Sequence, residues 1–144
     1  MKRAAMVLAL LAGAATLWAQ GRRFASPIQP NPSYDGQFTF VRLRYGEETT
    51  FVSQGIPWSH DYPTGERHFM QILNEVTNLK PKIADTSILA LDDPDLARYP
   101  IAYMAEPGYW TATDAEAEAF RAYLRKGGFV IFDDFSESRG GWAA

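Results

Sequence analysis

Four short apolar stretches alternate with two amphipathic segments along this chain, and this alternation limits the possible folds more than any other feature. The stretches are rich in aromatic and β-branched residues and read as strands at Phe38–Tyr45, Ser87–Leu91, Ile101–Ala105 and Phe129–Phe132. The order strand, helix, strand, strand, helix, strand is typical of α/β domains. We therefore predict a mostly parallel sheet with flanking helices.

The two helices are predicted from apolar spacing and from signals at their ends. Apolar residues recur at helical spacing between Phe69 and Leu79, which predicts a helix over about residues 65–78. Thr64 precedes it as a candidate N-cap. Thr113 and Glu116 have the spacing of a capping box and predict the start of the second helix.

The N-terminus has the pattern of a secretory signal peptide over residues 1–19. Lys2 and Arg3 precede an apolar run from Ala4 to Ala19 that is shorter than the roughly 20 residues needed to span a bilayer. We expect cleavage after Ala19, and a cut after Gly21 remains open because Leu17 stands where a small residue is usual. The predicted location is periplasmic or otherwise exported, with membrane contact only if the leader stays uncleaved.

The mature chain divides into a lead-in and one domain. Residues 20–37 are rich in proline and predict an extended lead-in, whereas residues 38–144 form the α/β domain. Few residues follow Phe132, so the sheet has little room to continue. We expect a domain that is incomplete at its C-terminus, the alternative being an unusually small one.

Composition excludes several classes of function. The absence of cysteine excludes disulfide frameworks, thiolate metal sites and a cysteine nucleophile. Without Lys2 and Arg3, the 14 basic residues fall to 12 against 17 acidic ones, so the mature net charge is −5. Such a chain is not expected to bind nucleic acid or anionic lipid as its main partner. No cofactor is predicted.

The candidate site lies at the carboxyl edge of the predicted sheet, where ligands bind in open parallel sheets. Carboxylates follow two of the strands, and a loop after the first strand adds a histidine, an aspartate and aromatic rings. The binding candidates are Trp58, His60, Asp61, Tyr62, Glu106, Asp133 and Asp134.

Carboxylates from separate strand ends can share a hard cation or act as general acid and base. We therefore predict a metal-assisted or acid/base site formed by Asp61, Glu106 and Asp133, with His60 assisting.

Purely structural roles are the alternative for the same residues. Asp61 would then cap a turn, Asp133 and Asp134 would accept backbone N–H groups, and Glu106 would pair with an arginine of the first strand, Arg42 or Arg44. Two interpretations also apply to the aromatic side chains of the loops, among them Trp58 and Tyr62. They stack on a ligand, or they form a hydrophobic lid over the sheet.

Four segments together resemble a known family. FTFVRLRY, WSHDYPTGE, RYPIAYMAEPG and RKGGFVIFDDF are similar to the exported bacterial family known as domain of unknown function 4159, from about Phe38 to Phe135. The resemblance implies a flavodoxin-like domain of the class I glutamine amidotransferase-like superfold, which usually continues beyond the end of this chain. Amidotransferase chemistry is not implied, because it needs a cysteine nucleophile.

Three functions remain open at this level. The first is an exported domain that binds a ligand or an envelope protein at the carboxyl edge of its sheet. The second is a metal-assisted hydrolase of a cell-envelope glycan or ester, and the third is a purely structural role in an envelope complex. The sequence leaves open whether the protein is an enzyme.

Overall fold

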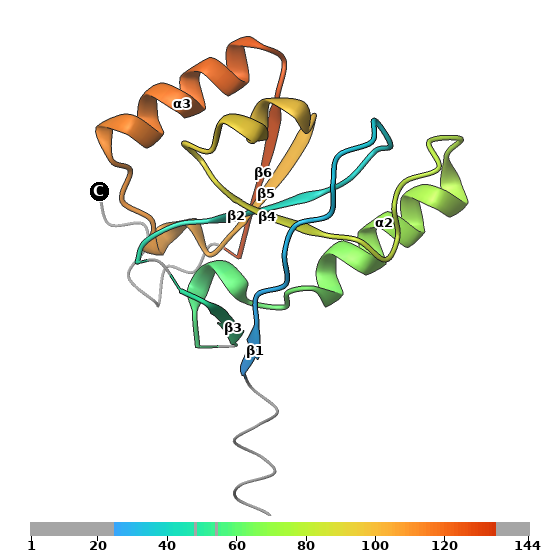
Figure 1. Ribbon diagram of the computed structural model, residues 1–144, viewed down its shortest axis with the longest axis horizontal. Coiled ribbons are helices and arrows are strands. Elements are labelled where there is room, and N and C mark those ends of the chain that lie inside the picture. Colours follow the sequence, from blue (N-terminus) through green and yellow to red (C-terminus); the bar gives the residue numbers. More distant parts are fainter. Residues whose placement is uncertain (1–24, 48, 54, 135–144) are drawn as a thin grey trace, which may run out of the picture.

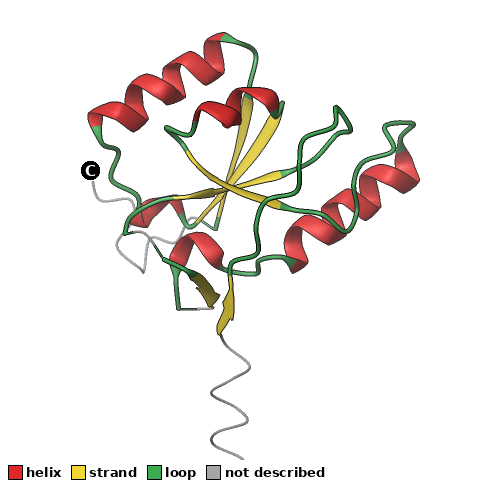
Figure 2. Ribbon diagram, in the orientation of Figure 1, coloured by secondary structure: helices red, strands yellow, loops and turns green. Residues whose placement is uncertain are grey.

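The computed structural model describes residues 25–47, 49–53 and 55–134, so the predicted signal peptide and its cleavage site lie outside the described residues. The main sheet has four strands in the order β4-β2-β5-β6: β2 (Val41–Arg44), β4 (Ser87–Ala90), β5 (Ile101–Ala105) and β6 (Phe129–Asp133). Every neighbouring pair is parallel. The predicted α/β architecture is confirmed (Figure 2).

The order of the strands creates a switch point in the middle of the sheet. The chain runs from β2 to β4 on one side, then crosses to β5 on the other side of β2 and continues to β6 beside it. This order is flavodoxin-like, and in such sheets ligands bind where the connections diverge at the carboxyl ends of the strands. Here that place lies beyond the ends of β2 and β5.

The helices α2 (Thr64–Val76) and α3 (Asp114–Arg125) cover opposite faces of this sheet (Figure 1). Val41 and Leu43 of β2 join the core that includes Tyr123 of α3, whereas Arg42 between them bonds to Glu66 of α2. The alternation of side chains along a strand thus sends one set to each helix. No helix within the described ranges is long and apolar enough to cross a membrane.

The start of α3 is the predicted capping box. The Glu116 N–H donates to the Thr113 hydroxyl oxygen at 3.2 Å, and the Thr113 N–H donates to the Glu116 carboxylate at 2.9 Å. Two backbone donors that a helix start leaves unpaired are therefore satisfied locally.

The start of α2 differs from the prediction. Thr64 is the first helical residue, and its hydroxyl does not cap the helix. The N–H groups of Thr64 and Gly65 donate instead to the backbone carbonyl oxygen of Asp61, at 2.7 and 3.1 Å. Two of the apolar residues that recur at helical spacing, Ile72 and Val76, are 55% and 72% exposed.

Two very short strands form a second sheet that the sequence did not reveal. β1 (Ala25–Pro27) pairs antiparallel with β3 (Phe51–Ser53), so part of the proline-rich lead-in contacts the loop after β2. The lead-in also touches β4, because the Asn31 side chain bonds to both the N–H and the carbonyl oxygen of Ile88, at 2.8 and 2.7 Å. Three residues are too few for a strand pattern to be visible in a sequence.

We predict that Gly128→Ala destabilises the domain. A Cβ atom at this position would lie 2.4 Å from Cζ of Tyr123, a buried ring that cannot swing away easily because its hydroxyl donates to the Tyr99 carbonyl oxygen at 2.9 Å. The free energy of unfolding, measured in urea, should fall by about 1–3 kcal/mol. Gly55→Ala is the control, since its nearest atom is Ser53 Oγ at 3.7 Å; equal losses in both variants would contradict the packing described here.

Candidate functional site

Hydrogen bonds connect the carboxyl ends of three strands. The Tyr45 hydroxyl, just after β2, lies 2.9 Å from the carbonyl oxygen of Ala105 and 2.7 Å from that of Glu106, and donates to this pair. The Glu106 N–H donates to the carbonyl oxygen of Asp133 at 2.9 Å. Burial, and then the charge of Glu106, raise the pKa of Tyr45, so its phenol stays neutral and keeps its donor proton.

A histidine and three carboxylates meet at this edge. His60 Nδ1 lies 3.3 Å from Asp134 Oδ2, 3.7 Å from Glu106 Oε1 and 4.0 Å from Asp61 Oδ2. One potential ligand atom from each of His60, Asp61 and Asp134 falls within 4.8 Å of the others. We call His60, Asp61, Glu106 and Asp134 the edge cluster.

The three acidic residues of the edge cluster share an uncommon backbone conformation. Asp61, Glu106 and Asp134 have φ values of 58°, 45° and 61°, in the left-handed region that non-glycine residues seldom adopt. They come from three different segments. Asp61 lies in the turn before α2, Glu106 directly follows β5, and Asp134 directly follows β6. Such residues concentrate at functional sites, where the surrounding structure holds them in place.

Asp133 does not join this cluster. Its carboxylate accepts a hydrogen bond from the Tyr103 hydroxyl at 2.6 Å, on the face of the sheet that α2 covers. Asp134 follows with a left-handed backbone, and its own carboxylate lies 3.3 Å from His60 Nδ1. Of the three carboxylates that the sequence predicts as metal ligands, Asp61 and Glu106 therefore lie beside His60, and Asp134 occupies the place expected for Asp133.

The predicted aromatic candidates lie away from the edge cluster. The Trp58 side chain is 1% exposed and belongs to the hydrophobic core, so its ring has no open face for stacking on a ligand. Tyr62 is half-buried, and its hydroxyl lies 2.5 Å from Thr86 Oγ1. For these two rings the packing interpretation fits the geometry better than the stacking one.

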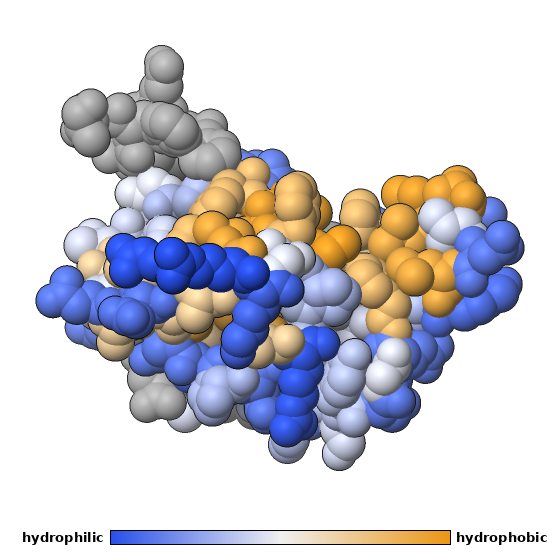
Figure 3. Space-filling view, turned by 90° about the horizontal axis from the view of Figure 1, so that it is seen from above, coloured by the Kyte–Doolittle hydropathy of each residue, from blue (hydrophilic) through white to orange (hydrophobic). Residues whose placement is uncertain are grey.

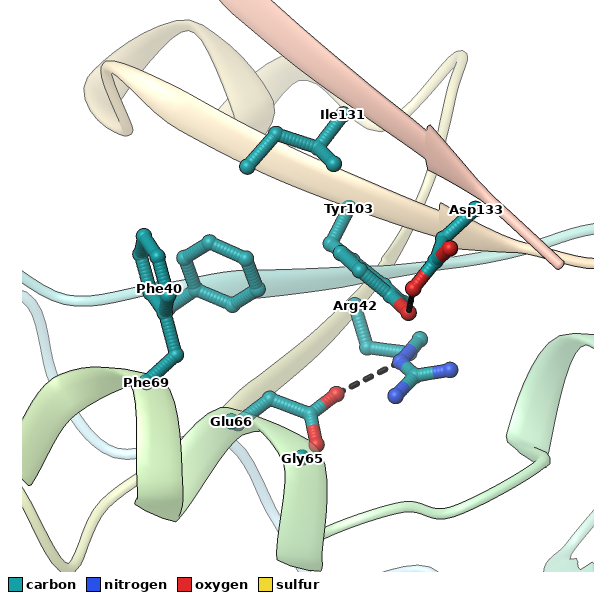
Figure 4. Close-up of a pocket in the computed structure, with 8 residues that line it drawn as sticks. All are labelled: Phe40, Arg42, Gly65, Glu66, Phe69, Tyr103, Ile131 and Asp133. Atoms are coloured by element: carbon teal, nitrogen blue, oxygen red, sulfur yellow. Dashed lines mark hydrogen bonds and ion pairs between the residues drawn. The ribbon is translucent and has the colours of Figure 1, made fainter. Parts of the chain in front are cut away.

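A buried ion pair lies directly behind the edge cluster. Arg42 Nε donates to Glu66 Oε1 at 2.5 Å, and both side chains are almost fully buried (Figure 4). The Arg42 guanidinium also lies 4.5 Å from the centre of the Tyr103 ring, within the range of a cation–π contact. A buried charge is tolerated when it is paired and hydrogen-bonded in this way.

Arg42 also holds the turn that contains His60. Its Nη1 group donates to the backbone carbonyl oxygens of Trp58 at 3.1 Å and of His60 at 3.0 Å. One guanidinium thus joins β2, α2 and the loop between them. The position of the His60 imidazole at the sheet edge depends on this buried arginine.

The ion pair between Arg42 and Glu66 was not predicted from the sequence, although a signal for it was present. Arg42 lies between apolar residues in a strand that pairs with neighbours on both sides, so its side chain had to find a buried partner. The structural alternative paired Glu106 with Arg42 or Arg44, whereas the partner of Arg42 is Glu66 in the first turn of α2.

Comparison with protein-family models finds one match. The model described as "Domain of unknown function (DUF4159)" matches residues 39–144, which include every residue of the edge cluster and both members of the buried ion pair. Comparison with curated proteins finds no match, and neither does comparison with solved structures.

We predict strong coupling between Arg42 and Glu66. Arg42→Met leaves the Glu66 carboxylate buried without its cation, so the free energy of unfolding in urea should fall by about 3–5 kcal/mol. Combining Arg42→Met with Glu66→Leu removes both charges and should recover part of that loss. If the double variant is no more stable than Arg42→Met alone, the pair does not have the role described here.

Proposed function

The chain belongs to the DUF4159 family over residues 39–144. For this member we propose that the edge cluster binds a divalent cation through His60, Asp61 and Asp134. The bound cation would then hold a ligand or a protein partner. The observation on which the proposal depends is the convergence of one imidazole and three carboxylates from separate segments at the switch point of a parallel sheet.

The distances within the cluster support a metal site. Ligand atoms about 2.1 Å from a tetrahedral zinc ion lie roughly 3.4 Å from one another. The distances from His60 Nδ1 to the three carboxylates, 3.3 to 4.0 Å, are close to that value. Small side-chain rotations would therefore be enough to surround an ion.

The kinds of ligand atoms indicate which metal to expect. Imidazole nitrogen suits zinc and other transition metals, and carboxylate oxygen suits harder cations such as manganese and magnesium. A mixed set of one nitrogen and several oxygens favours zinc or manganese over magnesium or calcium. His60 and Asp134 are partly exposed, so the metal would keep a position open for an oxygen atom of the ligand.

We place this activity outside the cytoplasm. Lys2 and Arg3, followed by the apolar run that ends at Ala19, support export through a cleaved signal peptide. The partner expected there is a small ligand or an envelope protein, and the acidic balance of the mature chain argues against nucleic acid.

Hydrolysis is a second candidate function, and one observation favours it. Glu106 Oε1 lies 3.7 Å from His60 Nδ1 and its side chain is nearly buried beside the proposed ligands. A carboxylate in that position could take a proton from a metal-bound water, which would then attack a glycan or ester of the cell envelope.

Metal titration by calorimetry tests the proposal. We expect one zinc ion per chain, and His60→Ala and Asp134→Asn should each weaken zinc binding by about tenfold or more. Asp133→Asn is the matched comparison, because it changes the neighbouring carboxylate on the other face and should leave zinc affinity nearly unchanged. No binding of zinc, manganese, magnesium or calcium, or a loss of binding in Asp133→Asn alone, would refute the site.

The zinc-loaded protein also separates binding from hydrolysis. If the domain is a hydrolase, it should cleave envelope glycans or simple esters, and Glu106→Gln should abolish cleavage while zinc still binds. Zinc binding without any cleavage by the unaltered protein would leave ligand binding as the function and reject the hydrolase.

A further inference from the structure

A second candidate site lies next to the edge cluster, on the face of the sheet that α2 covers, between α2 and the strands β5 and β6. It is a cavity of about 310 Å³. Phe40, Phe69, Ile131 and the ring of Tyr103 form its apolar walls, and its charged groups come from Arg42, Glu66 and Asp133 (Figure 4). The edge cluster contributes none of these residues.

The charges around this cavity are unbalanced. Arg42 is already neutralised by Glu66, and its Nη1 group is occupied by two backbone carbonyl oxygens. Asp133 has no cationic partner among the described residues, and its carboxylate accepts only from the Tyr103 hydroxyl and its neighbour's N–H. One positive and two negative groups therefore line the cavity, which favours a cationic occupant.

The carboxylate of Glu66 argues against an anionic occupant. Glu66 Oε2 is buried and has no hydrogen-bond partner within the described part of the chain, while Oε1 of the same carboxylate is bonded to Arg42. Leaving a buried acceptor unpaired is costly. A carboxylate ligand would add a third negative charge beside it.

The walls suit a ligand with an apolar body. The ring of Phe40 lies 5.3 Å from that of Phe69 and 5.7 Å from that of Tyr103, measured between ring centres. Phe40 is buried against these two rings, so Phe69 and Ile131 form the apolar wall that a ligand can contact. Phe129 alternates with Ile131 on the same face of β6 and is 60% exposed, so it adds apolar surface on this side of the sheet. Figure 3 shows apolar residues gathered on the surface seen from above.

We propose that this cavity binds a small organic cation: a primary amine joined through a short chain to an aromatic or aliphatic group. The ammonium lies against Asp133, and the apolar group lies against Phe69 and Ile131. The volume of the cavity is at the lower end of the range for small-molecule sites, which matches a single ring with a short chain.

Phenethylamine is the probe, and 3-phenylpropanoate is the control with the same ring and the opposite charge. Both are titrated into the full chain with EDTA present, so that coordination of a metal at the edge cluster cannot contribute. We expect saturable 1:1 binding of the amine, followed by NMR, with a Kd of about 1 mM or below. The amine should bind at least about tenfold more tightly than the acid.

Variants locate the binding. Asp133→Asn should remove the preference for the amine, and Ile131→Trp should weaken binding of the amine by filling the cavity. Glu118→Gln removes the same charge from an exposed position on α3 and should change nothing. The proposal is overturned if the acid binds as tightly as the amine, if the amine does not bind, or if both cavity variants bind it normally; failure of zinc binding at the edge cluster would not affect these outcomes.

Discussion

The buried ion pair between Arg42 and Glu66 is the interaction on which the other features of this protein depend. It lies between the sheet and α2, and the same guanidinium bonds to the carbonyl oxygens of Trp58 and His60. Since desolvating two charges is costly, such a pair is retained where its geometry fixes something else. Here it fixes the start of α2 and the turn that places an imidazole at the sheet edge, and both of its members also line the second candidate site.

Much of the fold could be predicted from the sequence because its signals are local. Strand stretches, helical spacing and the Thr113 capping box depend on neighbouring residues, and the four main strands and both helices are where these signals placed them. The short strands β1 and β3 were missed because three residues show no period. The predicted cap of α2 was wrong because the helix begins one residue earlier: Thr64 is itself helical, and the Asp61 carbonyl oxygen accepts from the N–H groups of Thr64 and Gly65.

The candidate site was predictable in its location but not in its detail. Parallel strands bring their carboxyl ends to one edge, so the meeting of Glu106, Asp61 and His60 follows from topology. Asp133 is the last residue of β6 and lies on the same face as Ile131, so the alternation of the strand directs it to the side that α2 covers and leaves Asp134 at the edge cluster. The partner of Arg42 depends in turn on how α2 packs against the sheet, which is a tertiary contact without a local signal.

The Nε–H proton of Arg42, observed by NMR, tests this account most directly. In the structure this proton is buried and bonded to Glu66, so its exchange with water should be as slow as that of core backbone amides. Its NMR chemical shift should also change in the Glu66→Gln variant. The exposed arginines of α3, Arg121 and Arg125, should exchange rapidly in the same spectrum. If Arg42 exchanges as fast as they do, the ion pair is not formed and nothing holds His60 where the account places it.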